Sequence, residues 1–511
     1  MRPHAAAIVE RKHGRDRITT FSELEDSSAK IAALLRQMGI RKGDPILVFQ
    51  PMSSDLYAVL LGIFRLGAIA MFLDPSAGRG HINRCCGLLV PRALIAVPKA
   101  HLLRAISAAL RCIPVKFATG FGLPGAVPLS RSGMLPALHE IAHCDDDTPA
   151  LVTFTSGSTG LPKAAVRTHG FLLAQHDVLE RSIQLVPGEV DLTTLPVFLL
   201  ANLASGVTSV IPDADLRKPG AINPEPVLSQ ITRHRVTRCA ASPAFFECLL
   251  SADDSSRISM QCMKKIFTGG APVFPRLLDQ LAACAPEASV DAVYGSTEAE
   301  PIAHIPHHEI MEKDREDMRH GNGLIAGWTI PEIGLRIIRD QWGKQLGPFQ
   351  SAGFEQMQQP IGSIGEIVVT GDHVLKSYLH HHGDEETKFS VNGQIWHRTG
   401  DAGKLDSLGR LWLLGRCAAK IKDDRGEIYP FAVECVAMKY ARIKRAACLL
   451  HKEKRLLIVE PGPGFTETEK EALCEDLEWA DLDAVRTVKH IPVDKRHNAK
   501  IDFPALRKIL G

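Results

Sequence analysis

The chain has 511 residues, and its 45% hydrophobic and 23% charged residues match the averages of soluble globular proteins. This composition excludes a disordered or fibrous chain, and at roughly 150 residues per domain the length allows about three folding units. Sixty Lys and Arg residues against fifty-eight Asp and Glu residues leave a net charge of +2, which carries no overall signature of nucleic-acid or anionic-membrane binding. We therefore expect small-molecule partners and no nucleic acid.

The twelve cysteines show no CxxC pair, and Cys85 and Cys86 are adjacent, so a disulfide framework is not expected. Reduced thiols predict a cytoplasmic location. The first sixteen residues lack an apolar core of signal-peptide length. The most apolar run, from Leu56 to Gly67, is about half the ~20 residues that a bilayer requires and contains Arg65. It predicts a buried helix and no integral membrane span.

Apolar residues recur at helical spacing from Ser22 to Met38, which predicts an amphipathic helix. From Ile333 to Val369, strand-like runs follow one another with no long helix, as in a smaller sheet or distorted barrel. The alternation of helical stretches with β-rich runs before Ile333 favours an α/β fold with layered, largely parallel sheets. Before Ile333, β-rich runs alternate with helical stretches, and they cover Ile46–Phe49, Ala68–Leu73, Ala93–Val97, Leu151–Thr155, Val207–Ile211, Lys265–Thr268 and Ser289–Tyr294.

A Gly-rich, charged stretch at Gly400–Gly426 separates this large body from a final segment of about ninety residues. The final segment contains an amphipathic helix near Thr466–Leu477. We predict a large N-terminal domain at 1–414, a hinge at 415–418 and a small, mobile α+β C-terminal domain at 419–511.

The most informative segment reads LVTFTSGSTGLPKAAVRTH, from Leu151 to His169. It is neither a Walker loop nor a dinucleotide-binding GxGxxG motif. If it has no binding function, it is an ordinary Ser/Gly-rich linker. Glycines allow close backbone approach, while N–H groups and hydroxyls can surround phosphate oxygens. The sequence therefore predicts an anion cradle with Lys163 as its positive charge, and its N–H and hydroxyl groups come from Thr155, Ser156, Gly157, Ser158, Thr159 and Gly160.

Three later segments carry further chemistry, and each taken alone has an ordinary structural explanation. Asp291–Pro301 (DAVYGSTEAEP) is a β-rich run that ends in a small-residue turn followed by an acid. Trp396–Arg416 (WHRTGDAGKLDSLGRLWLLGR) places an acid between glycines, which is also a routine turn. Ile491–Ile501 (IPVDKRHNAKI) contains lysines that would otherwise be solvated surface charges.

Together, these four ordered segments resemble the adenylate-forming family that includes acyl-CoA synthetases, luciferases and peptide-synthetase adenylation domains. The resemblance extends from about Phe21 to Ile501 and implies ATP and Mg²⁺ as cofactors. It identifies TSGSTGLPK as a mobile phosphate-binding loop, although Ala164 stands where glycine is usual. It also identifies Gly269–Pro272, with Gly270 and Ala271, as an adenine-side loop.

The resemblance assigns a role to each remaining candidate. Glu298 would hold Mg²⁺, and Thr297 would contact the α-phosphate. Lys500 would offset charge that develops between the substrate carboxylate and the α-phosphate. The predicted catalytic residues are thus Lys500, Glu298, Thr155 and Thr297. Nucleotide contacts are further expected from Tyr294 near adenine with its neighbours Gly295 and Ser296, and from Asp401 and Arg416 at the ribose.

Departures from the family pattern bear on what accepts the acyl group. Acyl-CoA synthetases usually have Asp or Lys where this chain has Ala418, and the following turn reads IKDDRGEIYP. The β-lactone synthetases of bacterial olefin and β-lactone pathways look similar in four segments: LDPSAGRGHINRC, IAVPKAHL, ASGVTSVIPDADLRKP and IPVDKRHNAKI. That branch implies a hydrophobic 3-hydroxy acid that is activated and then cyclised, with other enzymes of a biosynthetic pathway as candidate partners.

Two alternatives remain at this stage: an acyl-CoA or acyl-carrier ligase, and a non-catalytic nucleotide-binding assembly partner. Phe198 and Leu199 occupy the stretch that borders the substrate in relatives. The histidine runs His307–His308 and His380–His382 lack partners at metal-site spacing, so we expect surface loops there.

Overall fold

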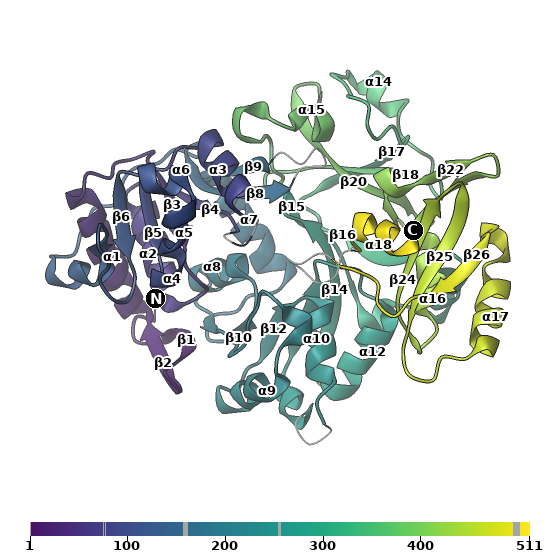
Figure 1. Cartoon of the computed structure of the whole chain (residues 1–511), viewed down its shortest axis with the longest axis horizontal. Coiled ribbons are helices and arrows are strands. Elements are labelled where there is room, and N and C mark those ends of the chain that lie inside the picture. The colour runs from purple at the N-terminus through teal and green to yellow at the C-terminus, as the bar shows by residue number, and fades with distance from the viewer. Residues whose placement is uncertain (1, 75, 77, 157–161, 254–256, 494–500) are drawn as a thin grey trace. The chain divides into compact units, whose positions relative to one another are not determined.

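The chain folds into two compact units (Figure 1). The first comprises Met1–Ile211 and Asp372–Glu385, and the second comprises Pro212–Gly371 and Glu386–Gly511. The computed structural model describes residues 2–74, 76, 78–156, 162–253, 257–493 and 501–511.

A seven-stranded sheet, in the order β7-β6-β5-β3-β4-β8-β9, forms the centre of the first unit. Its neighbours pair in parallel except for the antiparallel hairpin of β8 and β9. Its strands are β3 (Pro45–Phe49), β4 (Ile69–Phe72), β5 (Ala93–Ala96), β6 (Val115–Ala118), β7 (Val127–Pro128), β8 (Pro149–Ser156) and β9 (Pro162–Thr168). Strands β2-β1-β11-β10 form a second group, with β1 (Ala6–Lys12), β2 (Arg15–Thr20), β10 (Val190–Thr193) and β11 (Thr208–Val210).

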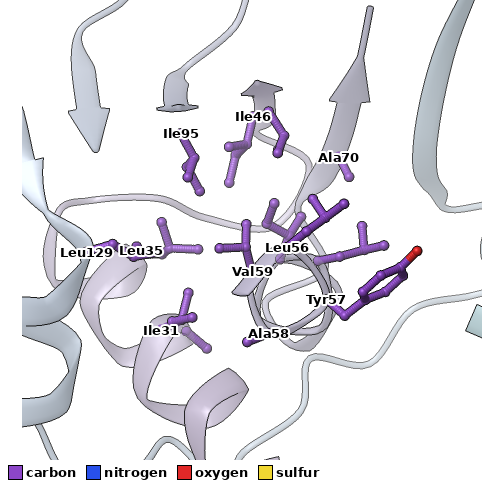
Figure 2. Close-up of a cluster of buried hydrophobic side chains, with 14 of the residues drawn as sticks. Ile31, Leu35, Ile46, Leu56, Tyr57, Ala58, Val59, Ala70, Ile95 and Leu129 are labelled. Atoms are coloured by element: carbon purple, nitrogen blue, oxygen red, sulfur yellow. The ribbon is translucent and has the colours of Figure 1, made fainter. Parts of the chain in front are cut away.

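Helices cover both faces of the seven-stranded sheet, because successive strand residues point to opposite sides. On one face, Ile31 and Leu35 of α1 pack with Val59 of α2 against Ile46 and Ile95 (Figure 2). A separate buried cluster joins α3 and α6 to the alternate strand residues. The helices of this unit are α1 (Phe21–Gln37), α2 (Ser54–Arg65), α3 (Arg79–Leu88), α4 (Pro98–His101), α5 (Leu103–Ile106), α6 (Ala108–Cys112), α7 (His169–Ser182) and α8 (Pro196–Ala204).

The helices predicted at Ser22–Met38 and Leu56–Gly67 are confirmed as α1 and α2. Arg65 is buried, as the second prediction requires, and it forms an ion pair with Glu25. Among the described residues, no helix is long and apolar enough to cross a membrane.

The second unit contains a sheet in the order β12-β13-β14-β15-β16-β21-β20-β18-β17. β12 to β14 are parallel, and the later strands pair antiparallel. The strands predicted over 333–369 are confirmed as β17 and β18, and they continue the larger sheet through β16, which pairs with both β15 and β21. The strands are β12 (Arg238–Ala241), β13 (Lys265–Gly269), β14 (Ser289–Ser296), β15 (Ala299–Pro306), β16 (Leu324–Thr329), β17 (Gly334–Ile338), β18 (Gly365–Thr370), β20 (Gln394–Leu405) and β21 (Leu411–Arg416), with β19 (Lys388–Val391) beside β20.

In the described part of this unit, the helices before its last ninety residues or so include α9 (Pro224–Arg233), α10 (Pro243–Leu250), α12 (Pro275–Cys284), α13 (Glu312–Arg319) and α14 (Ser351–Glu355). The C-terminal part has its own α+β core, in which β24 and β25 are antiparallel and β26 joins β25 in parallel. Its elements are β22 (Ile421–Asp423), β23 (Gly426–Ile428), α16 (Pro430–Met438), β24 (Ile443–His451), β25 (Lys454–Pro461), α17 (Glu467–Asp476), β26 (Ala484–Thr487) and α18 (Phe503–Leu510).

The helix predicted near Thr466–Leu477 is α17, and Thr466 and Glu469 form its capping box. The compact units divide at other positions than the predicted boundary at 415–418, which lies inside the second unit. The division into 1–414, 415–418 and 419–511 therefore stays a prediction.

One buried carboxyl in the C-terminal core gives that core a pH dependence. Glu434 of α16 is buried, and its Oε1 accepts the backbone N–H of Cys448 at 2.9 Å. Burial raises its pKa to about 7 from an ordinary value of 4.5. Because the pKa is higher in the folded state, this group stabilises the fold fully below about pH 4.5. That contribution is lost as the pH rises through 7.

We predict that Glu434→Gln removes this pH dependence, since an amide keeps the acceptor oxygen and does not ionise. The carboxyl costs the folded protein up to roughly 3 kcal/mol above pH 7, from a shift of about 2.5 pKa units. Thermal melting at pH 5.5 and pH 8.0 checks this. The variant should melt higher than the parent at pH 8.0 and nearly equally at pH 5.5. A constant difference between the two proteins at both pH values would contradict the prediction.

Candidate active site

The predicted anion cradle lies at the tip of the β8–β9 hairpin. Thr155 pairs with Lys163 and Ser156 with Pro162, so the two strands hold both ends of the loop in register. Predicted loop residues Gly157, Ser158, Thr159 and Gly160 lie outside the described residues. The hairpin thus fixes where the loop begins and ends.

Lys163 packs against a turn in Asp372–Glu385, the second chain segment of the first unit. Its Nζ lies 5.7 Å from the centroid of the Tyr378 ring. Gly383 has φ +100°, and a Cβ there would lie 2.6 Å from Cε of Lys163. The positive φ favours glycine at this position, and a larger residue would also displace the end of the Lys163 side chain. Ala164, which replaces the usual glycine, is buried in the core on its own side of the sheet, so its methyl group is accommodated.

Phe198 and Leu199, the predicted acyl-side residues, also belong to the first unit. Both are buried in α8, and Leu199 is part of the α1–α2 core. Leu199 therefore packs in the hydrophobic core with α1 and α2.

In the second unit, three predicted nucleotide residues meet at one carboxylate. Tyr294 Oη donates to Asp401 Oδ2 at 2.7 Å, and Arg416 Nε lies 3.2 Å from Asp401 Oδ1. The three residues come from β14, β20 and β21, and Asp401 is directly opposite Arg416 in the β20–β21 register. A carboxylate offers about four acceptor positions, so both oxygens retain capacity for further donors.

Both partners of Asp401 in this trio have raised pKa values. Burial, followed by the negative charge of Asp401, raises the pKa of Tyr294 well above its ordinary value. The pKa of Arg416 is also raised, mainly by Asp401. Tyr294 therefore remains a hydrogen-bond donor at neutral pH, and Arg416 remains a cation.

Thr399 was not predicted, yet it fixes the geometry of this trio. Its hydroxyl accepts the backbone N–H of Asp401 at 3.0 Å, and its carbonyl accepts Arg416 Nη1 at 3.0 Å. The motif WHRTGD contained this Thr, and a Thr hydroxyl can accept the backbone N–H two residues further on. Beneath it, Arg398 and Glu366 form a buried bidentate ion pair that joins β20 to β18.

Glu298 occupies the turn between β14 and β15. The register pairs Ser296 with Ala299, and the backbone N–H of Glu298 donates to Ser296 Oγ at 3.3 Å. Its side chain is half-buried, and its charge contributes to the raised pKa of Arg416. Glu298 is thus electrostatically close to the Asp401 group, whereas Thr297 is exposed in the same turn.

Gly269 is the last residue of the neighbouring strand β13, and Gly270 and Ala271 follow it. A Cβ on Gly269 would lie 2.5 Å from the carbonyl oxygen of Val293, so only glycine fits beside β14. Gly270 has φ +79°, and the chain turns away there. This loop therefore lies beside the strand that carries Tyr294, Gly295 and Ser296.

Lys500 lies outside the described residues. The residues that flank its segment are paired, since Val493 bridges Ile501 and Asp502 N–H donates to the carbonyl of Pro492 at 2.9 Å. The role of Lys500 stays a prediction.

The predicted histidine loops differ in their contacts. His307 and Arg315 both contact the carboxylate of Asp279, with Nε2 of His307 at 2.7 Å. His380 and His381 have positive φ in a short turn. Among the described residues, no group of three or more His, Cys, Asp or Glu side chains is arranged to hold a metal ion.

Comparison with known proteins places these features in a family context. A family model described as "AMP-binding enzyme" matches residues 1–379. An olefin beta-lactone synthetase of Stenotrophomonas maltophilia (strain K279a) is 29% identical over 503 residues, which cover 94% of this chain and 89% of that protein. 4-Coumarate–CoA ligase 3 of Oryza sativa subsp. japonica is 26% identical over 471 residues, which cover 89% and 79%.

Solved structures share the fold. ATP-bound MatB from Rhodopseudomonas palustris aligns with a TM-score of 0.80 at 20% identity, over 99% of this chain and 96% of that chain. The amide bond synthetase McbA from Marinactinospora thermotolerans aligns with a TM-score of 0.79 at 21% identity, over 99% and 97%. The mixed α/β fold with a large N-terminal part and a small C-terminal part is thereby confirmed.

We predict that Glu298→Gln lowers pyrophosphate release from ATP and a carboxylic acid by roughly 100-fold, because it removes the negative charge that would hold Mg²⁺ beside the ATP phosphates. Raising the Mg²⁺ concentration should recover part of the rate. Glu287→Gln, just before the same strand, is the matched control and should keep full activity. Melting curves test whether both variants fold. Full activity in a folded Glu298→Gln variant would remove Glu298 from the site.

Proposed function

Because the chain belongs to the family of AMP-binding enzymes and activates a carboxylic acid as its acyl-adenylate, we propose that this acid is a 3-hydroxy acid, which the enzyme cyclises to a β-lactone. The observation that carries the proposal is the similarity to two olefin beta-lactone synthetases at 29% identity over 94% of the chain. Family membership sets aside the alternative of a non-catalytic partner.

The turn after the proposed hinge supports a reaction without a thioester step. Asp423 accepts Arg455 Nε at 2.7 Å, and Arg425 Nη2 lies 3.0 Å from Asp483 Oδ2. The Arg455 contact is the main reason why the pKa of Asp423 falls to about 2. Asp423 and Arg425 of IKDDRGEIYP are thus paired within the C-terminal part. In acyl-CoA synthetases, by resemblance, this turn would approach the pantetheine arm.

The hinge itself lacks the usual charged residue. Ala418 lies in a short 3-10 helix at Cys417–Ala419. The adjacent Lys420 contacts Asp340 at 2.9 Å, and Tyr429 donates to the same carboxylate at 2.8 Å. We propose that residues 415–418 form the hinge and that 419–511 form a lid carrying Lys500. These polar contacts would hold the lid in one orientation, which suits a reaction that needs only one acyl acceptor.

In the proposed first step, a carboxylate oxygen of the acid attacks the α-phosphorus of ATP, and pyrophosphate leaves. Asp401 would accept the ribose hydroxyls while Arg416 holds its carboxylate in place. Lys500 would offset the negative charge that accumulates during the attack. Glu298 would hold Mg²⁺, which supplies positive charge to the ATP phosphates. A single half-buried carboxylate suits that ion, which generally takes its other ligands from phosphate and water.

In the proposed second step, the 3-hydroxyl oxygen attacks the acyl carbonyl, the bond to AMP breaks, and the hydroxyl proton is released. The nucleophile is already part of the substrate, so the reaction gains the effective concentration of an intramolecular attack. Closing a four-membered ring also requires that water be kept from the adenylate.

The second candidate is an acyl-CoA or acyl-carrier ligase. Its support is the similarity to 4-coumarate–CoA ligases, at 26% identity over 89% of the chain in the rice protein. The two candidates share the first step and differ only in the acyl acceptor.

We predict that Lys500→Ala lowers the rate of adenylation by about 100-fold or more, the usual scale for a preorganised electrostatic contact. The KM for ATP should change little, because Asp401 and Arg416 are retained. Pyrophosphate release measures the rate. Lys489→Ala, which changes an exposed lysine just before the Ile491–Ile501 segment, is the control. Equal rates for the two variants would make Lys500 an ordinary surface residue.

We predict that a 3-hydroxy acid and ATP yield a β-lactone, AMP and pyrophosphate at a rate that does not depend on coenzyme A. Mass spectrometry identifies the acyl product. A 2-hydroxy acid and an unsubstituted fatty acid are the matched substrates. Each should stop at the acyl-adenylate, because neither can close the four-membered ring.

If turnover instead requires coenzyme A and gives an acyl thioester without lactone, the ligase candidate replaces the proposal. Loss of pyrophosphate release with every acid would count against both candidates. One set of assays therefore distinguishes lactone formation, thioester formation and the absence of pyrophosphate release.

A further inference from the structure

Charge is distributed unevenly along the chain. Residues 75–139 contain eight Lys and Arg residues and no Asp or Glu. The whole chain carries +2, so the rest of it carries −6. A run of sixty-five residues without an acid is exceptional in a chain that has fifty-eight acids elsewhere.

This segment supplies β5, β6 and β7 at one edge of the seven-stranded sheet and α3 and α6 on one of its faces, while Leu129 after β7 packs into the α1–α2 core on the other face. Its strands and inner helix faces are buried, so the cations lie outside. Within the described part of the chain, none of the eight forms an ion pair. The exposed cations are Arg79, Arg84, Arg92, Lys99, Arg111 and Arg131, while Arg104 and Lys116 are half-buried.

Large apolar side chains are exposed among these cations. Leu102 is 71% exposed and Ile106 is 53% exposed on the short helices α4 and α5 and their junction, and Phe121 is 67% exposed in the loop after β6. The loop and the helices are neighbours, because Arg104 Nη1 lies 3.5 Å from the carbonyl of Pro124.

The same region crowds like charges together. Arg111 Nη1 donates to the carbonyl of Ala105 at 2.9 Å, which brings a second guanidinium to α5. Burial and then the positive charge of Arg104 lower the pKa of Lys116. Lys116 and Arg104 likewise contribute to the lowered pKa of the buried His101, whose main cause is burial. Anions from outside the chain would relieve this repulsion.

We propose that this surface docks the protein on an anionic lipid bilayer. We call it the edge surface, and it consists of Lys99, Leu102, Arg104, Ile106, Arg111 and Phe121. The apolar side chains would enter the headgroup region, and the cations would contact lipid phosphates. The protein would lie on the membrane without spanning it.

Two features favour a bilayer over an acidic protein. The apolar groups are single side chains that project from short helices and from the Gly-rich loop TGFGLPG, as insertion into a fluid layer requires. A protein interface would present a packed apolar centre inside a polar rim. The cations of the edge surface, Lys99, Arg104 and Arg111, are also interleaved in the chain with Leu102 and Ile106, which suits a membrane that offers lipid phosphates above an apolar layer.

The test is sedimentation of the full-length protein with vesicles. The vesicles contain either phosphatidylcholine alone or phosphatidylcholine with 30% phosphatidylglycerol. We expect binding only to the anionic vesicles, and the binding should weaken as salt is added. Lys99→Glu/Arg104→Glu/Arg111→Glu should weaken it by about 100-fold or more, since each cation contributes several-fold. Leu102→Ser/Phe121→Ser should weaken it while leaving the charge unchanged.

Lys313→Glu/Lys444→Glu/Lys454→Glu makes the same change in net charge on exposed residues of the second unit and should keep the binding. Melting curves and pyrophosphate release with a water-soluble acid should be unchanged in every variant, so the test does not depend on the acyl acceptor. Equal binding of the control and the edge-surface variants would overturn the proposal. It would also be overturned if the parent ignored anionic vesicles while the edge-surface variants altered its self-association, because the surface would then be a protein interface.

Discussion

The carboxylate of Asp401 is the point on which the candidate site in the second unit depends. It accepts a hydrogen bond from Tyr294 and faces Arg416, so it joins β14, β20 and β21 at one place. A half-buried carboxylate is costly unless it is paired, and these two partners compensate it. Because Thr399 fixes the backbone of Asp401 and holds Arg416, the trio is rigid before any ligand arrives.

That rigidity explains how one carboxylate can serve both structure and binding. A bound ribose would find an acceptor whose position is already fixed, so little conformational entropy is lost on binding. The buried Arg398–Glu366 pair continues the same support into β18. Glu298 adds a second negative charge near Arg416, at the turn after β14. The nucleotide side of the site is therefore built on strands, and its turn positions carry the residues expected to face the phosphates.

Local patterns in the sequence predicted local structure well. The periodicity of α1, the length of α2 and the β-rich runs all correspond to observed elements, because each depends on neighbours within a few residues. The motifs also pointed to Asp401, Arg416 and Tyr294, which the structure brings into contact. Their mutual contacts could not be predicted, since Tyr294 and Asp401 are 107 residues apart in the chain. The burial of Glu434 was missed for the same reason: a lone acid in a helix gives no sign of what packs around it.

The net charge of the chain hides an uneven distribution of charged residues. A value of +2 describes a chain with no electrostatic preference, yet that value combines a segment of +8 with a remainder of −6. Electrostatic attraction between a protein and a surface falls off within about 8 to 10 Å in physiological salt, so only the nearest charges act. Acids that lie farther away than this therefore do not cancel the cations of 75–139 at a surface that meets them. Partner classes have to be inferred from the charge of each face, and the net charge of the chain limits only its behaviour at long range.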